Sequence, residues 1–205
     1  NQHKFSDYAD YLHENLPAQA ELDLQREKPL NPAPLVSVAI ACSGASRAVV
    51  RSTLEALGKQ TYANFEVCVV SELAQAGLTD YEGIPKFRLV LFNGTAHEQL
   101  KAAEKMLNGA YFLQLLPGDL PAPDALHMLV LQTHSNPEAE VVFADEDSVI
   151  DGIRQNPIFK PDYGRDTLRS FNSIGRPMLV SKRVHTAVGG FRGSTPAELW
   201  AYCIE

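Results

Sequence analysis

GAYFLQLLPGDLPAPDAL, at residues 109–126, is the stretch that decides the fold of this chain. Its first part, 111–116, is an apolar run with the length and composition of a buried strand. The pair Pro117-Gly118 then marks a sharp turn that carries Asp119, and Pro123-Asp124 begins a helix. Ligands of open α/β sheets bind outside the carboxyl ends of such strands, so this turn is the first candidate for a functional site.

Strands and helices alternate on the amino-terminal side of this stretch. Three further apolar, β-rich runs are expected to be strands, and a helical or weakly helical segment follows each of them. The expected strands are 35–42, 65–70 and 87–92, and the expected helices are 47–58, 73–76 and 95–107. Ser46 is placed to cap the first of these helices. Alternation at these lengths predicts right-handed βαβ units and a mostly parallel sheet.

Both ends of the chain depart from this alternation. Residues 1–33 combine two stretches with helical spacing and three prolines, which indicates a helical arm and a linker outside the sheet. After an expected fifth strand at 141–144, we expect a hairpin or loop, a short helix, a strand and a final helix, at 145–161, 166–171, 178–181 and 182–188. The predicted fold class is α/β: a Rossmann-like, mostly parallel sheet flanked by helices, with a mixed carboxyl-terminal half within 34–205.

Composition excludes several classes of function. The 205 residues are 45% hydrophobic and 21% charged, with a net charge of −7. That composition is typical of a globular domain, and the excess of acidic residues argues against a nucleic-acid partner. Three cysteines fit no zinc spacing, which favours a reducing, cytoplasmic location. Because the chain starts without Met and its last element has no stop signal, we expect a carboxyl-terminally truncated piece of a longer protein.

Three widespread functional motifs are absent from the sequence. It has no Gly-x-Gly-x-x-Gly after the first expected strand, no Gly-x-x-x-x-Gly-Lys-Ser/Thr and no Gly-x-Ser-x-Gly. The six histidines form no i,i+4 pair that would bind a metal. Dinucleotide binding of the Rossmann kind, a P-loop nucleotidase and a serine hydrolase therefore lose their main support.

A set of short blocks in the same order resembles inverting family-2 nucleotide-sugar glycosyltransferases, especially the bacterial surface-polysaccharide, rhamnosyltransferase-like branch. The blocks are VSVAI (36–40), LGKQTYANF (57–65), EVCVV (66–70), GAYF (109–112), PDAL (123–126), ADED (144–147), FKPD (159–162), NSIG (172–175) and VGGFR (188–192). The resemblance covers about residues 34–193 and implies the GT-A fold. It also implies a nucleotide-sugar donor, a glycan acceptor, Mg²⁺ or Mn²⁺ as cofactor if the domain is active, and further domains of the same polypeptide, through which any membrane association would arise.

The metal site of the family is where this chain departs from the pattern. The D-x-D motif, which holds the divalent metal, aligns with residues 116–118, a leucine, a proline and a glycine that offer no carboxylate. Asp119 is then a weak candidate for metal or donor contact, or simply a turn residue. Asp145 and Asp147, on either side of Glu146, form the one acidic cluster nearby. They are either weak metal or acceptor contacts or part of a structural turn.

Two other requirements of the family chemistry are met by unusual residues. Ser71 and Glu72 stand where the family has an Asp that contacts the nucleotide, and Glu72 could reach a ribose hydroxyl or be an ordinary helix-start residue. The family's general base aligns with Pro196. Glu198 is a weak candidate base in its place, or a solvated residue on a helix.

The sequence therefore leaves two functions open. One is an active glycosyltransferase that uses Glu72, Asp119 and Glu198 as atypical groups. The other is a non-catalytic module for scaffolding or glycan binding in a larger polysaccharide-assembly protein. Because three requirements of the chemistry fail together, we favour impaired or absent catalysis. Arg176 and Arg192 are the basic residues to examine for contact with a phosphate.

Overall fold

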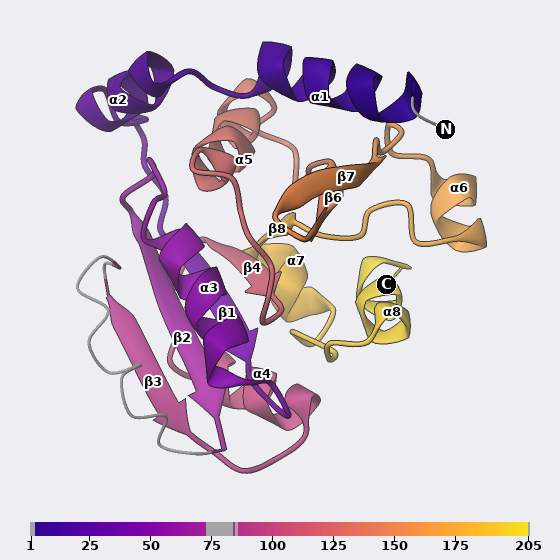
Figure 1. Cartoon of the computed structure of the whole chain (residues 1–205). Coiled ribbons are helices and arrows are strands. Elements are labelled where there is room, and N and C mark those ends of the chain that lie inside the picture. Colours follow the sequence, from indigo (N-terminus) through magenta and orange to yellow (C-terminus); the bar gives the residue numbers. More distant parts are fainter. Residues whose placement is uncertain (1–2, 73–83, 85, 205) are drawn as a thin grey trace.

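A six-stranded sheet forms the centre of the computed structural model, which describes residues 3–72, 84 and 86–204 (Figure 1). Its strand order is β3-β2-β1-β4-β8-β5. Four strands pair in parallel: β1 (Val36–Ala41), β2 (Phe65–Ser71), β3 (Phe87–Leu91) and β4 (Tyr111–Leu115). β8 (Met178–Ser181) runs antiparallel to its neighbours β4 and β5 (Val141–Phe143). The predicted mostly parallel α/β sheet is confirmed.

The central strands are covered on both faces, which explains their continuous apolar sequences. All residues of β1 and β2 are buried. Because side chains alternate along a strand, one set of β1 residues packs with α3 (Arg47–Leu57) and α5 (Ala125–Ser135), and the other set packs with α4 (Ala96–Glu104). In Figure 1, α3 lies in front of β1 and β2, and α4 lies on the other side. This sandwich holds the carboxyl ends of β1 and β4 at one edge.

The carboxyl-terminal half adds a separate hairpin and three short helices. β6 (Glu146–Ile150) and β7 (Ile153–Ile158) pair antiparallel outside the main sheet, at the place predicted for a hairpin or loop. α6 (Arg165–Ser170) and α7 (Lys182–Ala187) lie close to their predicted bounds, and α8 (Pro196–Ile204) follows. Among these elements, β8 enters the main sheet between β4 and β5, so the mixed half is built onto the parallel half.

The amino-terminal arm forms two helices, α1 (His3–Asn15) and α2 (Gln19–Glu27). α1 lies beside the hairpin (Figure 1), where the ring of Tyr11 meets that of Phe159 edge to face at 5.1 Å between centroids. The hydroxyl of Tyr8 donates to Oδ2 of Asp147 at 2.5 Å. The weak helix expected at 73–76 lies outside the described residues. No helix in the described part of the chain is long and apolar enough to cross a membrane.

A buried carboxylate joins the three central strands at their amino-terminal ends. Glu66 in β2 is 1% exposed and accepts hydrogen bonds from Ser37 Oγ, Asn108 N and Arg88 Nη1 at 2.7, 2.5 and 2.7 Å. Burial alone would raise the pKa of Glu66, but these hydrogen bonds and the charge of Arg88 lower it. Ser37 Oγ also accepts from Gly109 N at 2.7 Å, so the network fixes the start of β4.

Candidate functional site

A hollow of about 360 Å³ lies at the carboxyl ends of β1 and β4. Its walls come from the end of β1, the loop and first turns of α3, the start of α4, the turn after β4 and the segment before α8. The lining residues are Ala41, Ser43, Gly44, Ala45, Ser46, Val49, Ala96, Leu116, Pro117 and Ser194. This is the edge at which open α/β sheets bind ligands. A second cavity, between Gln114 and Tyr202, measures about 10 Å³ and has room for little more than one water.

The residues that line the hollow carry no charge, and α3 begins in its wall. Ser46 takes the N-cap position of α3, as predicted, but its side chain makes no capping hydrogen bond, so the predicted cap is wrong in this respect. The first backbone N–H groups of α3 therefore donate no hydrogen bond to the Ser46 hydroxyl. They give this wall a partial positive character from the helix dipole.

The turn after β4 is fixed by three hydrogen bonds. Asp119 N donates to Leu116 O at 3.0 Å, and Leu116 N donates back to Oδ2 of Asp119 at 2.8 Å. Gly118 N donates to Thr53 Oγ1 in α3 at 2.8 Å. With Pro117 in the second position and Gly118 at φ +96° in the third, this is the pattern of a type II turn. The positions that align with D-x-D thus form a tight turn held to α3.

Replacement of Gly118 by a residue with a β-carbon should lower the stability of the fold. We expect Gly118→Ala to lower the free energy of unfolding by about 1–2 kcal/mol, because a residue with a β-carbon is strained at positive φ. A β-carbon there would also lie 3.3 Å from Cγ1 of Val49. Gly118→Asn should cost less, since Asn visits the left-handed region more readily. Urea denaturation of the two variants measures the difference; equal losses would contradict the conformational explanation.

Asp119 and Arg176 are brought together although 57 positions separate them in the sequence. Nε and Nη2 of Arg176 donate to the two carboxylate oxygens of Asp119 at 3.0 and 3.2 Å, and both side chains are partly buried. The sequence identified both residues as candidates for donor contact but did not pair them. Because Oδ2 of Asp119 also accepts from Leu116 N, both oxygens of this carboxylate are engaged.

The acidic triplet before and within β6 is bound by the hairpin, by the segment after it and by α1. Asp145 Oδ1 accepts from Lys160 N at 2.8 Å, whereas Asp147 Oδ2 accepts from Arg154 Nε at 2.6 Å and from the Tyr8 hydroxyl. Glu146 lies 3.5 Å from Lys160 Nζ. These separate partners favour the structural alternative for the triplet. Within the described ranges, no group of three or more His, Cys, Asp or Glu residues is arranged to hold a metal.

Ser71 and Glu72 lie at the end of β2, beside the hollow. The side chain of Ser71 is buried and its carbonyl accepts from Phe92 N at 2.9 Å, so Ser71 presents no group to a ligand. Glu72 is exposed, and its Oε1 accepts from Ser43 Oγ, a lining residue of the hollow, at 3.2 Å. Of this predicted pair, only Glu72 is placed to reach a bound ligand.

Glu198 belongs to the start of α8 and closes a capping box with Thr195. Its Oε2 accepts from Thr195 Oγ1 and Thr195 N at 2.7 and 2.9 Å. The Thr195 hydroxyl, with help from the backbone N–H groups, lowers the pKa of Glu198. A general base works best with a pKa near the operating pH, so Glu198 is poorly suited to the role. It lies near the hollow all the same, because Ser194 lines that hollow.

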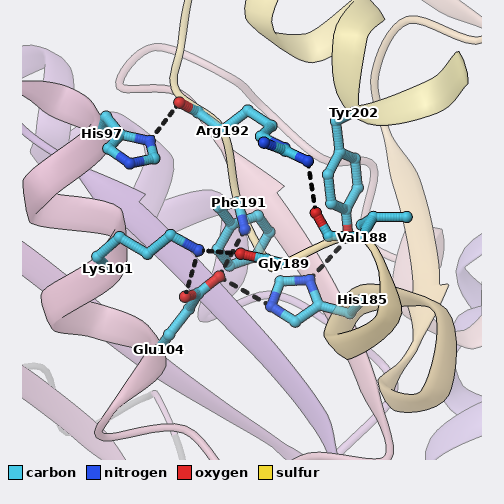
Figure 2. Close-up of polar contacts among 9 residues, drawn as sticks. All are labelled: His97, Lys101, Glu104, His185, Val188, Gly189, Phe191, Arg192 and Tyr202. Carbon is cyan, nitrogen blue, oxygen red and sulfur yellow. Dashed lines mark hydrogen bonds and ion pairs between the residues drawn. The ribbon is translucent and has the colours of Figure 1, made fainter. Parts of the chain in front are cut away.

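A polar network that the sequence did not reveal positions the Gly-Gly-Phe-Arg segment (Figure 2). Glu104 of α4 accepts from Lys101 Nζ, His185 Nε2 and Phe191 N at 2.9, 2.9 and 2.5 Å. Burial alone would raise the pKa of Glu104, but the hydrogen bonds from these three partners lower it. The glycine pair before Phe191 is the sequence feature that could have indicated this network. Gly190 has φ +80°, and a β-carbon there would collide with Glu104.

Arg192 and Gln114 complete the surroundings of this segment. Nη2 of Arg192 donates to Val188 O at 2.7 Å, so its guanidinium points to the end of α7 (Figure 2). Gln114 of β4, which is 8% exposed, donates from Nε2 to Gly193 O at 2.7 Å. Of the two arginines considered for phosphate contact, Arg176 pairs with Asp119 in the turn after β4.

Comparison with curated proteins gives two relatives, and no family model matches the chain. The chain is 30% identical over 185 residues to an uncharacterized protein, y4gI, of Sinorhizobium fredii, a match over 84% of this chain and 20% of that protein. It is 25% identical over 196 residues to the O-antigen biosynthesis protein RfbC of Myxococcus xanthus, over 91% of this chain and 15% of RfbC. The chain thus spans a fifth or less of these relatives.

Solved structures decide the fold family. The chain superposes on residues 1–349 of S. aureus TarS with a TM-score of 0.61 and 14% identity, over 81% of this chain and 53% of that one. A mannosyltransferase from Pyrobaculum calidifontis, solved with GDP-Man and Mn²⁺, gives a TM-score of 0.57 and 18% identity, over 87% of this chain and 55% of that one. The chain has the GT-A glycosyltransferase fold. The expectation that the family resemblance carried for the fold is confirmed.

Proposed function

We propose that the hollow binds the nucleotide part of a nucleotide-diphosphate sugar, in a module of polysaccharide synthesis whose sugar-transfer step is impaired or lost. The position of the hollow is the observation that carries this proposal. It opens at the ends of β1 and β4 of a GT-A sheet, and the turn that aligns with D-x-D forms one of its walls. TarS has been solved with UDP and with UDP-GlcNAc, and the mannosyltransferase with GDP-Man.

The loss of transfer rests on the carboxylates near the hollow. Asp119 is held by Arg176 and by Leu116 N, and Glu198 is held in its capping box with a lowered pKa. Asp119 therefore has no free carboxylate oxygen to offer as a base, and the lowered pKa of Glu198 is far from the raised value that a general base at neutral pH needs. Glu72 is exposed and accepts from Ser43 Oγ, so it can contact a ligand at the edge of the hollow. A nucleotide sugar would then bind without efficient attack by an acceptor hydroxyl.

The proposal also covers the cellular location of the protein and its other partners. A glycan acceptor is one of these partners. Further domains of the same polypeptide are the other, because the matched part is only 20% and 15% of the two curated relatives. The cysteines described in the structure are free, with Cys42 and Cys68 buried. Free thiols agree with a reducing compartment such as the cytoplasm.

Calorimetric titration of the chain with UDP, GDP and TDP tests donor binding. We expect one of them to bind with a Kd between about 1 μM and 1 mM. Val49→Trp, which places a large ring in the hollow, should weaken this binding at least tenfold. Val149→Trp is the matched control, because Val149 lies exposed on the hairpin rather than in the hollow. Failure of all three nucleotides to bind, or equal binding by both variants, would refute the proposal.

A second candidate, glycan binding without a nucleotide, is favoured by exposed aromatic side chains. Four aromatic residues, from α1 and from the segments after β7 and α6, are exposed by 41–65%: Tyr11, Phe159, Tyr163 and Phe171. Contiguous exposed apolar patches mark binding surfaces, and of these four residues the rings of Tyr11 and Phe159 are in contact. Retardation of the chain in gels that contain bacterial polysaccharide, and loss of that retardation in Tyr163→Ala, would support this function.

A further inference from the structure

The residues at the carboxyl end of β4 do not fit a divalent metal. Mg²⁺ and Mn²⁺ need several oxygen ligands in regular geometry, and the D-x-D positions supply none from side chains. Asp119 is the one carboxylate in this turn, and both of its oxygens are engaged by Arg176 and Leu116 N. A cation bound to Asp119 would therefore have to share a carboxylate whose charge the Arg176 guanidinium already balances.

We propose that the guanidinium of Arg176 supplies the positive charge that a metal supplies in related sites, so that a nucleoside diphosphate binds to this chain without a divalent metal. This inference rests on the proposed function, because it concerns the same hollow. It identifies Arg176 as the residue that carries the charge, and it removes the need for a divalent metal.

Arg176 is joined through Asp119 to the turn that forms one wall of the hollow, and it also lines the small cavity near Gln114. Oδ2 of Asp119 accepts from both Arg176 Nε and Leu116 N, and Leu116 lines the hollow. The residues that line the hollow are all uncharged, so a diphosphate there needs a cation from just outside the lining. Arg192, the other basic candidate, directs its guanidinium to Val188 O.

The Arg176 side chain keeps donors for a ligand. Asp119 occupies Nε and Nη2, whereas Nη1 has no hydrogen-bond partner among the residues that the structure describes. A guanidinium can hold a carboxylate on one edge and a phosphate oxygen on another, because its five N–H donors lie in one plane. Hydrogen bonds of this kind between charged groups are about twice as strong as those between neutral ones.

The backbone of Arg176 is held from behind by a buried lysine. Lys160 Nζ donates to Arg176 O at 2.6 Å and lies 3.5 Å from Glu146, and the Lys160 side chain is 3% exposed. Gly175 has φ +56°, and a β-carbon there would lie 2.6 Å from Glu146 Oε1, so the segment before Arg176 is closely confined. These backbone contacts and the two hydrogen bonds to Asp119 together fix the position of the guanidinium. A fixed guanidinium lowers the entropy cost of binding a ligand.

Titration of the chain with UDP, GDP and TDP, in EDTA and in Mn²⁺, tests the inference. We expect the same affinity under both conditions and a loss of at least tenfold in Arg176→Gln. Arg183→Gln is the matched control: Arg183 also pairs with a carboxylate, Glu140, and lies on α7 away from the hollow. Its affinity should equal that of the unchanged chain. Thermal unfolding of each variant verifies that it is folded at the titration temperature.

Asp119→Asn separates the two explanations by the sign of its effect. If Arg176 carries the charge, removing its counter-charge should leave nucleotide binding unchanged or strengthen it severalfold, still without metal. If Asp119 is a metal ligand, the same variant should lose binding. Affinity that requires Mn²⁺, or that falls in Asp119→Asn, would overturn this inference and leave the proposed function standing. Absence of nucleotide binding under both conditions would refute the proposed function, and the inference with it.

Discussion

Glu66→Ala is expected to destabilise the fold by about 3–5 kcal/mol, because it removes a buried carboxylate that accepts hydrogen bonds from three donors. The carboxylate is 1% exposed and holds Ser37 Oγ, Asn108 N and Arg88 Nη1. Its removal leaves a buried hydroxyl and a backbone N–H without their acceptor, and each such group costs about 1–3 kcal/mol. It also leaves the guanidinium of Arg88 without its counter-charge.

Urea denaturation followed by circular dichroism measures this loss. Glu55→Ala is the matched control, since Glu55 forms an exposed i,i+4 pair with Arg51 on α3 that is worth about 0.5 kcal/mol or less. We expect the loss for Glu66→Ala to exceed that of the control several times over. If the two variants lost equal stability, the network would not hold the strands together as inferred.

The Glu66 network also predicts a pH dependence. Because the pKa of Glu66 is lowered in the folded chain, its ionised form stabilises the fold at any pH above the ordinary carboxyl pKa, about 4.3. This contribution decreases as the pH falls below that value and is lost once the pH passes below the folded pKa. The free energy of unfolding should therefore fall less steeply between pH 5 and pH 3 in Glu66→Ala than in the unchanged chain.

Glu104→Gln is the second variant with a large expected effect, about 2–4 kcal/mol of lost stability. Glutamine keeps the size of the side chain but removes the charge that pairs with Lys101 and replaces one acceptor oxygen by a donor. The segment 189–192 should then loosen, because Phe191 N, His185 Nε2 and the Lys101 ammonium that donates to Gly189 O all depend on this carboxylate (Figure 2).

Hydrogen exchange of the Phe191 amide reports the local part of this effect. We expect its protection to fall in Glu104→Gln by a larger factor than the protection of β1 amides, which lie in the centre of the sheet. Glu138→Gln provides the control at an exposed glutamate. The pKa of Glu104 is also lowered, so its stabilising effect is present above the ordinary carboxyl pKa and is lost on acidification. Uniform loss of protection across the sheet would contradict a local anchoring role.

The order of the elements followed from the sequence because each signal is local. Apolar runs of strand length, helical spacing and breakers such as Pro117-Gly118 act within a few residues. They predicted β1 to β5, β8, α3, α4, α6 and α7 within a few residues of their bounds, helices in the arm and after Asp124, and a hairpin or loop where β6 and β7 lie. The segment 73–76 lies outside the described residues. The departure at 116–118 from the family's D-x-D motif was likewise visible without coordinates, because it depends only on residue identity.

Only the tertiary structure decided which distant residues meet. Asp119 and Arg176 are 57 positions apart, and β8 enters the sheet between β4 and β5 although 34 residues separate it from the end of β5. Glu66, inside a strand, gave no sign that it would be a buried anchor. Such contacts depend on chain topology and on the need of every buried polar group for a partner, and neither has a local sequence signature. The turn at 116–119 was therefore located by sequence, whereas its charge partner was determined by the packing of the whole chain.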